Sequence, residues 1–138
     1  MGRIIAIDYG RKRTGLAVSD SMRLIAGALT TLPGDKVINF LRDYMSKESV
    51  DLFVLGEPKQ MNNQPSENMQ WVLLFKNQLQ KAFPDIEIKM VDERFTSVLA
   101  HRAMLDGGLK KKDRRNKEIV DQLSATIILQ TYLETNRI

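Results

Sequence analysis

Three acidic residues in this chain stand where a strand or a helix would hold them in place. Asp8 ends the apolar run 4–7, Glu93 follows the alternating segment 86–90, and Asp121 lies early in a final amphipathic helix. A carboxylate at the end of a buried strand stays charged at low cost only when a cation meets it. Three gathered carboxylates would form the oxygen-rich site with which paired divalent ions hydrolyse phosphodiester bonds. The pattern therefore favours metal binding and phosphoryl transfer.

Each acid also has a simpler interpretation. Asp8 precedes the turn 9–15, so its side chain could cap that turn through the backbone, and the two interpretations carry equal weight. Asp121 could interact with the positive end of its own helix, with Arg94 as its partner. The small residues Ser124 and Ala125 lie one turn further along the same face, so we expect the helix to approach the sheet closely.

Composition limits which metals the chain can bind. It has 138 residues, enough for one ordinary core, and we expect a single domain over residues 1–138. There is no cysteine and a single histidine, which excludes thiolate zinc sites and histidine-rich sites. Oxygen ligands favour Mg²⁺ or Mn²⁺. No apolar run is long enough to span a membrane and no signal peptide is present, so the sequence predicts a soluble, cytoplasmic protein without a membrane partner.

Positive charge is concentrated in two places, although the formal net charge is only +4. One cluster is 11–13, in the first turn, and the other is 110–117. Both could follow a phosphate backbone, and a solvated loop is the simpler alternative for a lysine run. The residues that we expect to contact nucleic acid are Lys12, Arg13, Arg94, Lys110, Lys111, Lys112, Arg114 and Arg115.

The order of apolar patterns predicts the fold class. Three short strands at 4–7, 16–20 and 24–29 form a meander, and further strands are expected at 51–56 and 86–90. Helices are expected from a cap at Asp35 through residue 45, from a cap at Ser66 to residue 83, from 96 or 97 to 105, and from about 116 to 135. Such an order predicts an α/β fold with one five-stranded mixed sheet and helices on both faces.

The chain resembles the YqgF family, also called RuvX, of Holliday-junction-resolvase-like proteins assigned to processing the 5′ end of pre-16S ribosomal RNA. The resemblance covers essentially the whole length, and its motifs are specific only when taken together. The matching motifs are Asp8-Tyr9-Gly10 with Lys12-Arg13, Gly15 and Ser19-Asp20; Asp92-Glu93-Arg94 with Thr96 and Ser97; and Asp121 with Ser124, Ala125, Ile128 and Leu129.

The resemblance implies a ribonuclease H-like fold and gives catalytic and metal-binding roles to Asp8, Glu93 and Asp121. Strand alternation would put Asp92 on the face of Ile88 and Met90, so we expect Glu93 to bind metal and Asp92 to support it. One departure is Glu57, which stands where most of the family has leucine. It could be an additional ligand or an exposed turn residue, and we weigh these equally.

Two other residues could have functional roles. His101 could shuttle protons, but an exposed helix histidine is the commoner case. Trp71 lies on an amphipathic stripe, which favours the core or a subunit interface over a base-stacking platform.

The sequence thus predicts a metal-dependent nuclease for structured RNA, expected to process precursor ribosomal RNA in ribosome biogenesis. An alternative is a branched-DNA resolvase, which would act as a homodimer. A second alternative is a non-catalytic RNA-binding assembly factor. An actin-like nucleotide-binding domain ranks last, because such proteins bind nucleotide between two domains.

Overall fold

The strands of the protein form one mixed sheet. The computed structural model describes residues 2–57, 68–92 and 117–135, with side chains from residue 121 onward in the last range. Within these ranges the sheet has five strands in the order β3-β2-β1-β4-β5. Their bounds are β1 (Arg3–Asp8), β2 (Thr14–Ser19), β3 (Ala26–Leu32), β4 (Val50–Glu57) and β5 (Glu87–Asp92).

The three strands on one side of the sheet run in the same direction. β1 pairs with β4 in parallel, and β4 pairs with β5 in parallel. β2 is antiparallel to both β1 and β3. The prediction of a five-stranded mixed sheet is confirmed, and the carboxyl ends of β1, β4 and β5 meet at one edge.

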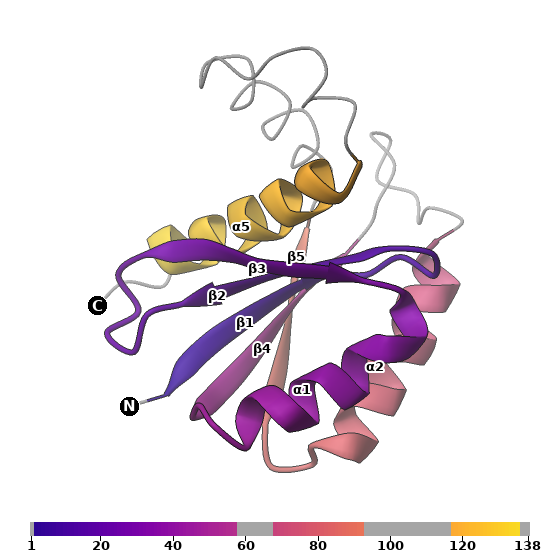
Figure 1. Cartoon of the computed structure of the whole chain (residues 1–138), viewed down its shortest axis with the longest axis horizontal. Helices are drawn as coiled ribbons and strands as arrows, with labels where there is room; N and C mark the ends of the chain where they lie inside the picture. Colours follow the sequence, from indigo (N-terminus) through magenta and orange to yellow (C-terminus); the bar gives the residue numbers. More distant parts are fainter. Residues whose placement is uncertain (1, 58–67, 93–116, 136–138) are drawn as a thin grey trace.

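Helices cover both faces of this sheet, as predicted (Figure 1). α1 (Val37–Met45) and α2 (Met69–Ala82) lie on one face, and α5 (Lys117–Thr135) lies on the other. Among the described residues, no helix is long and apolar enough to cross a membrane. The helix expected between 96 or 97 and 105 lies outside the described residues.

The central strands are buried on both faces, which explains their continuous apolar sequences. Alternate residues of β1 point into two separate cores: Ile5 and Ile7 into one, Ile4 and Ala6 into the other. The first core is closed by α1 and α2 through Val37, Leu41, Val72, Phe75 and Leu79. The second is closed by α5 through Ala125, Ile128, Leu129 and Leu133.

The third strand was predicted too early in the chain. Leu24 and Ile25 are 61% and 69% exposed and belong to a turn, and β3 begins only at Ala26. The reason is the Asp20 carboxylate, which accepts hydrogen bonds from the backbone N–H groups of Met22, Leu24 and Ile25 at 2.8–3.1 Å. These bonds hold the segment in a turn, within which Arg23 has a φ of 59°.

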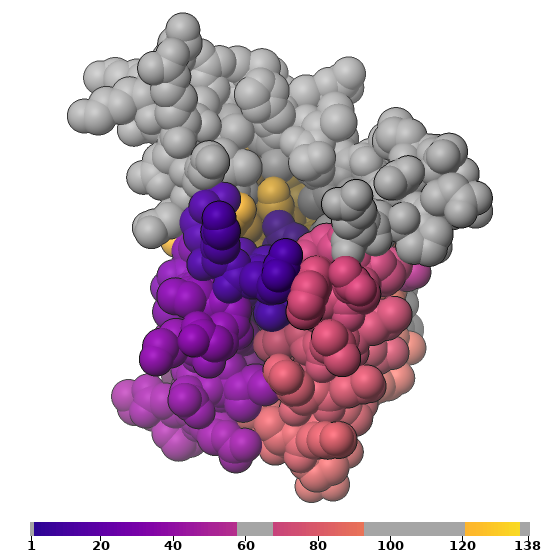
Figure 2. Space-filling view, turned by 90° about the vertical axis from the view of Figure 1, so that its right-hand side faces the viewer, coloured from indigo at the N-terminus to yellow at the C-terminus, as the bar shows by residue number. Residues whose placement is uncertain are grey.

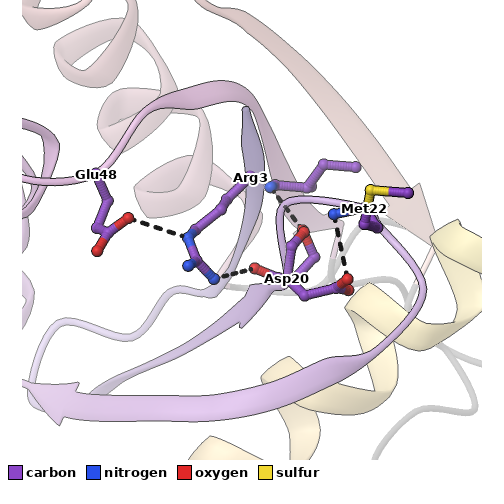
Figure 3. A network of polar contacts seen from close by, with 6 residues as sticks. Arg3, Asp20, Met22 and Glu48 are labelled. Carbon is purple, nitrogen blue, oxygen red and sulfur yellow. Dashed lines mark hydrogen bonds and ion pairs between the residues drawn. The ribbon is translucent and has the colours of Figure 1, made fainter. Parts of the chain in front are cut away.

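A polar network fastens this turn to the start of β1 (Figure 3). The Arg3 guanidinium donates to the Ser19 carbonyl at 3.1 Å and to Glu48 at 3.3 Å. The Ser19 hydroxyl accepts from the Ile4 N–H at 2.9 Å and donates to the Asp20 carbonyl. The turn before β3 is therefore fixed by side chains whose role a hydrophobic pattern does not reveal.

The prediction that Asp35 caps α1 was wrong. Residues Gly34–Lys36 form a short 3-10 helix, and Lys36 directly precedes α1 with no side-chain cap. The Lys36 N–H donates to the Pro33 carbonyl, which closes the 3-10 turn and leaves Asp35 inside it. α2 begins after Asn68, and Ser66, its predicted cap, lies outside the described residues.

The Asp20 turn makes a prediction about acid stability. The backbone N–H of Ile25, followed by those of Leu24 and Met22, lowers the pKa of Asp20 below its usual 3.8, against a smaller opposing effect of burial. A carboxyl whose folded pKa is depressed stabilises the protein above the unfolded pKa and loses that contribution as pH falls through the folded pKa. Asp20→Ala should therefore lower the urea midpoint near neutral pH, and the difference from the wild type should shrink below about pH 4.

Asp43→Ala is the matched control, because Asp43 is exposed and its side chain makes a long i,i+4 contact of 3.7 Å with Lys47. Its urea midpoint should stay close to that of the wild type at every pH. A constant Asp20→Ala deficit from neutral to acid pH would show that the charge of Asp20 plays no part.

Candidate active site at the strand ends

Three acidic residues occupy the carboxyl ends of the three parallel strands. β1 ends at Asp8, β4 at Glu57 and β5 at Asp92. Glu57 and Asp92 are register partners, and Ile7 pairs with Leu55 one strand over. All three acids therefore lie at the same edge of the sheet.

The faces of the sheet divide these acids into two groups. Ile4 and Ala6 point into the α5 core, so alternation along β1 puts Asp8 on the α5 face. Asp121 lies four residues before Ala125 and seven before Ile128, both buried in that core, so it projects from the same side of α5. Asp8 and Asp121 therefore share one face of the sheet.

A direct contact brings α5 against the strand beside Asp8. Asp8 is the register partner of Gly15 in β2. A Cβ added at Gly15 would lie 2.1 Å from the backbone carbonyl oxygen of Asp121, closer than any real Cβ contact. Because Gly15 has no side chain, the turn of α5 that contains Asp121 can pack directly on β2, next to Asp8.

The predicted close approach of α5 through small residues is also observed. Ser124 and Ala125 are buried, with exposed fractions of 7% and 0%. The position that must be a glycine for α5 to approach this closely is Gly15, and this role was not predicted from the sequence. A glycine inside an otherwise regular strand was the signal available for it, since such glycines mark a close backbone approach.

Within the described part of the chain, Asp121 pairs with Arg13, while Arg94, its predicted partner, lies outside the described residues. The Arg13 Nε lies 3.0 Å from Asp121 Oδ2, with the two side chains 41% and 22% exposed. An ion pair this open to solvent contributes about 0–1 kcal/mol, so it can rearrange when a stronger ligand arrives. Arg13 thus lies on the first turn, beside the candidate site.

Glu57 and Asp92 fall on the opposite face. Phe53 and Leu55 point into the α1–α2 core, so alternation assigns Glu57 to that side. Ile88 and Met90 pack against the same core and Val91 against the other, which puts Asp92 with Glu57. Asp92 thus lies on the face that strand alternation predicted for it. Glu57 was given two interpretations, and its position on the face opposite Asp8 and Asp121 disfavours the one in which it binds metal.

Comparison with known proteins identifies the family. Residues 2–135 match the family described as "RuvX: Holliday junction resolvase". The chain belongs to the RuvX family. Proteins of Phocaeicola vulgatus and Bacteroides thetaiotaomicron, both named "Putative pre-16S rRNA nuclease", are each 61% identical to it over 99% of both chains. The resemblance drawn from the sequence motifs is confirmed.

The fold of this RuvX-family chain is also similar to a resolvase of known structure. The RuvC protein of Thermus thermophilus, solved in complex with a Holliday junction substrate, aligns with a TM-score of 0.59 over 99% of this chain and 97% of that one. The two sequences are only 14% identical, so this likeness concerns the fold. The predicted ribonuclease H-like fold is confirmed.

Several predicted site residues of the RuvX-family chain lie outside the described residues. They are Glu93, Arg94, His101, Lys110, Lys111, Lys112, Arg114 and Arg115. In the described ranges 2–57, 68–92 and 117–135, no three histidine or acidic side chains gather as a metal site would require. The predicted site residues that the structure describes are thus Asp8 and Asp121, together with Lys12 and Arg13 on the first turn, of which Arg13 pairs with Asp121.

Proposed function

We propose that this RuvX-family protein is a single-domain, cytoplasmic, metal-dependent nuclease that hydrolyses phosphodiester bonds in structured RNA. The observation that supports the proposal is the close approach of the Asp121 backbone to Gly15, the register partner of Asp8, on the face of the sheet to which alternation assigns Asp8. The names of the similar proteins favour the immature 5′ end of pre-16S ribosomal RNA as the substrate.

Asp8, Glu93 and Asp121 would hold Mg²⁺ or Mn²⁺. The donors fit such an ion, because carboxylate oxygens suit hard divalent cations and the partly shielded Asp121 carboxylate already attracts the cationic Arg13. When bound, the ions would supply an activated water and stabilise the leaving oxygen. Arg13 would turn from Asp121 toward a phosphate oxygen of the substrate.

The pattern of β5 supports Glu93 over Asp92 as the third ligand. Asp92 belongs to the α1–α2 face, whereas Asp8 and Asp121 belong to the α5 face. A strand that continued by one residue would present its next side chain toward α5. For the same reason, Glu57 is not included among the proposed ligands.

Positive charge would hold the RNA strand. Lys12 and Arg13 are exposed on the first turn, and Arg94 with the 110–115 cluster would add contacts to phosphates. Such contacts make affinity fall steeply with salt without conferring sequence preference.

The test is cleavage of a precursor RNA that carries the immature 5′ end. Cleavage should require Mg²⁺ or Mn²⁺, stop when a chelator removes the metal, and return when the metal is restored. RNA that is bound but never cut under any of these conditions would refute the nuclease and favour the non-catalytic assembly factor.

A second candidate substrate is branched DNA, which the family description favours. Junction cutting would need two sites in a homodimer. A four-way junction tested beside the precursor RNA separates the candidates: we expect the RNA to be cut faster, and preferential cutting of the junction would overturn the RNA assignment.

A further inference from the structure

The turn between β1 and β2 borders a hollow on the surface, beside the proposed catalytic carboxylates. Gly10, Arg11, Lys12, Arg13 and Asn68 line this hollow, whose volume is about 380 Å³. Figure 2 shows the indigo N-terminal segment reaching the surface between the purple segment that contains α1 and the pink α2. The volume falls within the range of about 300–1,000 Å³ typical of sites for small molecules.

The backbone of this turn is held in place from below. The buried Thr14 hydroxyl donates to the Gly10 carbonyl at 2.8 Å and accepts from the Gly10 N–H at 3.2 Å. The Gly34 N–H donates to the Arg11 carbonyl at 3.1 Å. A Cβ at Gly34 would lie 2.8 Å from the Gly10 carbonyl oxygen, so the two segments pack as closely as glycine allows. The lining of the hollow is therefore largely preformed.

α2 is fastened to the same turn. The Asn68 side-chain amide donates to the Tyr9 carbonyl at 3.3 Å. The Tyr9 ring stacks on Phe75 of α2 with centroids 4.4 Å apart and planes at 19°. The first turn of α2, which carries Trp71, thus keeps a fixed position beside the hollow.

The Arg11 guanidinium lies over the ring of a tryptophan. Its guanidinium carbon lies 4.1 Å from the centre of the Trp71 ring, a cation–π contact. Arg11 is exposed and lines the hollow, and Trp71, half-buried, lies behind its guanidinium. A guanidinium plane supported in this way is a surface on which nucleic-acid bases stack.

The hollow adjoins the carboxylate site through a shared residue. Arg13 lines the hollow and also pairs with Asp121. A strand whose phosphate lay at the carboxylates would pass Arg13 and bring a neighbouring nucleotide to the hollow. Among the residues that the structure describes, the lining carries three positive charges and no negative one, which suits a phosphate-linked ligand.

We propose that the hollow is a nucleotide subsite in which an unpaired base of the RNA substrate stacks on Arg11, supported by Trp71, while Lys12 contacts its phosphate. This proposal rests on the proposed nuclease function and extends it by naming where a nucleotide next to the cut is held. It also revises the prediction for Trp71, which here supports a stacking surface through Arg11.

Trp71 is the only tryptophan in the chain, so its fluorescence reports on this place alone. The full-length Asp8→Asn protein, which should not cut RNA, is titrated with a short single-stranded oligoribonucleotide. Trp71 emission should change and saturate at the affinity given by the anisotropy of a dye on the RNA. RNA binding with no change in Trp71 emission would overturn the subsite.

Variants then test the stack itself. Arg11→Ala should weaken RNA binding about tenfold, as expected for loss of one stacked base. Arg11→Lys should weaken it nearly as much, because an ammonium keeps the charge but offers no planar surface. Arg42→Ala is the matched control: Arg42 lies 5.6 Å from the Phe83 ring, so the variant loses the same charge and a similar contact away from the hollow. Equal affinity of Arg11→Ala and Arg42→Ala would refute the proposal.

Two further arms separate other outcomes. AMP or ATP alone should leave Trp71 emission nearly unchanged, and saturation by a free nucleotide but not by RNA would overturn an RNA subsite. Cleavage of precursor RNA by the wild type is measured in parallel. If the wild type cleaves the RNA and Arg11→Ala still binds RNA with normal affinity, the subsite alone is refuted. If the wild type does not cleave the RNA but Trp71 emission changes on RNA binding as predicted, the nuclease function alone is refuted.

Discussion

Asp8→Asn and Asp121→Asn are each expected to lower the rate of RNA cleavage by about 10³-fold or more while the protein stays folded. An amide is similar in size to a carboxylate but lacks the negative charge that attracts a divalent cation and partly neutralises it. Loss of one preorganised electrostatic contact to a reacting centre commonly costs about 10²–10³-fold, and loss of a metal ligand should cost at least as much. The measurement is single-turnover cleavage of precursor RNA.

Asp43→Asn makes the same chemical change on the exposed surface of α1, where the side chain is 73% exposed. Its cleavage rate should equal that of the wild type. Thermal unfolding of all three variants shows whether the fold is kept, which matters for Asp121 because it pairs with Arg13. Full activity in either site variant would exclude that residue from the site.

Gly15→Ala is expected to destabilise the protein by about 2–4 kcal/mol. The new Cβ would lie 2.1 Å from the Asp121 carbonyl oxygen and 3.1 Å from the Gln122 nitrogen. These are backbone atoms of α5, so relief requires α5 to move away from β2, which also separates Asp121 from Asp8. Urea unfolding followed by circular dichroism gives the change in stability, and the cleavage assay should show a loss of activity in the fraction that remains folded.

Gly27→Ala is the matched control, because Gly27 lies in β3 next to β2 and, of the described atoms, its added Cβ would meet only the Val18 carbonyl oxygen at 3.9 Å. That is an ordinary van der Waals contact. Alanine loses less conformational entropy on folding than glycine, which favours the folded strand by about 0.5–1 kcal/mol. Gly27→Ala should therefore leave stability unchanged or slightly raised. Similar losses in the two variants would mean that α5 does not depend on Gly15.

Much of the fold could be predicted from the sequence because its central elements are buried on both faces. The runs in β1 and β4 are continuously apolar, and α5 follows a helical period, so hydrophobic pattern alone located them to within a few residues. The errors fell where backbone hydrogen bonding outweighed hydrophobicity. Leu24 and Ile25 look like strand residues, but the Asp20 carboxylate binds their N–H groups and keeps them in a turn.

The positions of several acids of the candidate site could be predicted from the sequence, but the side-chain contacts between distant segments could not. Asp8 and Glu57 could be predicted to end buried strands because each follows an apolar run, whereas the parallel register that sets Asp8, Glu57 and Asp92 at one edge comes from the structure. The pairing of Arg13 with Asp121 joins residues 108 positions apart, and no local pattern encodes it. The stack of Arg11 on Trp71 likewise depends on how the first turn meets α2, a tertiary contact between segments that each look ordinary alone.

The most direct test of the account is an anomalous diffraction map from crystals of the protein soaked in Mn²⁺. The account predicts manganese bound by carboxylate oxygens of both Asp8 and Asp121, with Arg13 displaced from Asp121. Manganese that binds elsewhere, or that contacts only one of these two carboxylates while the other points away, would contradict it.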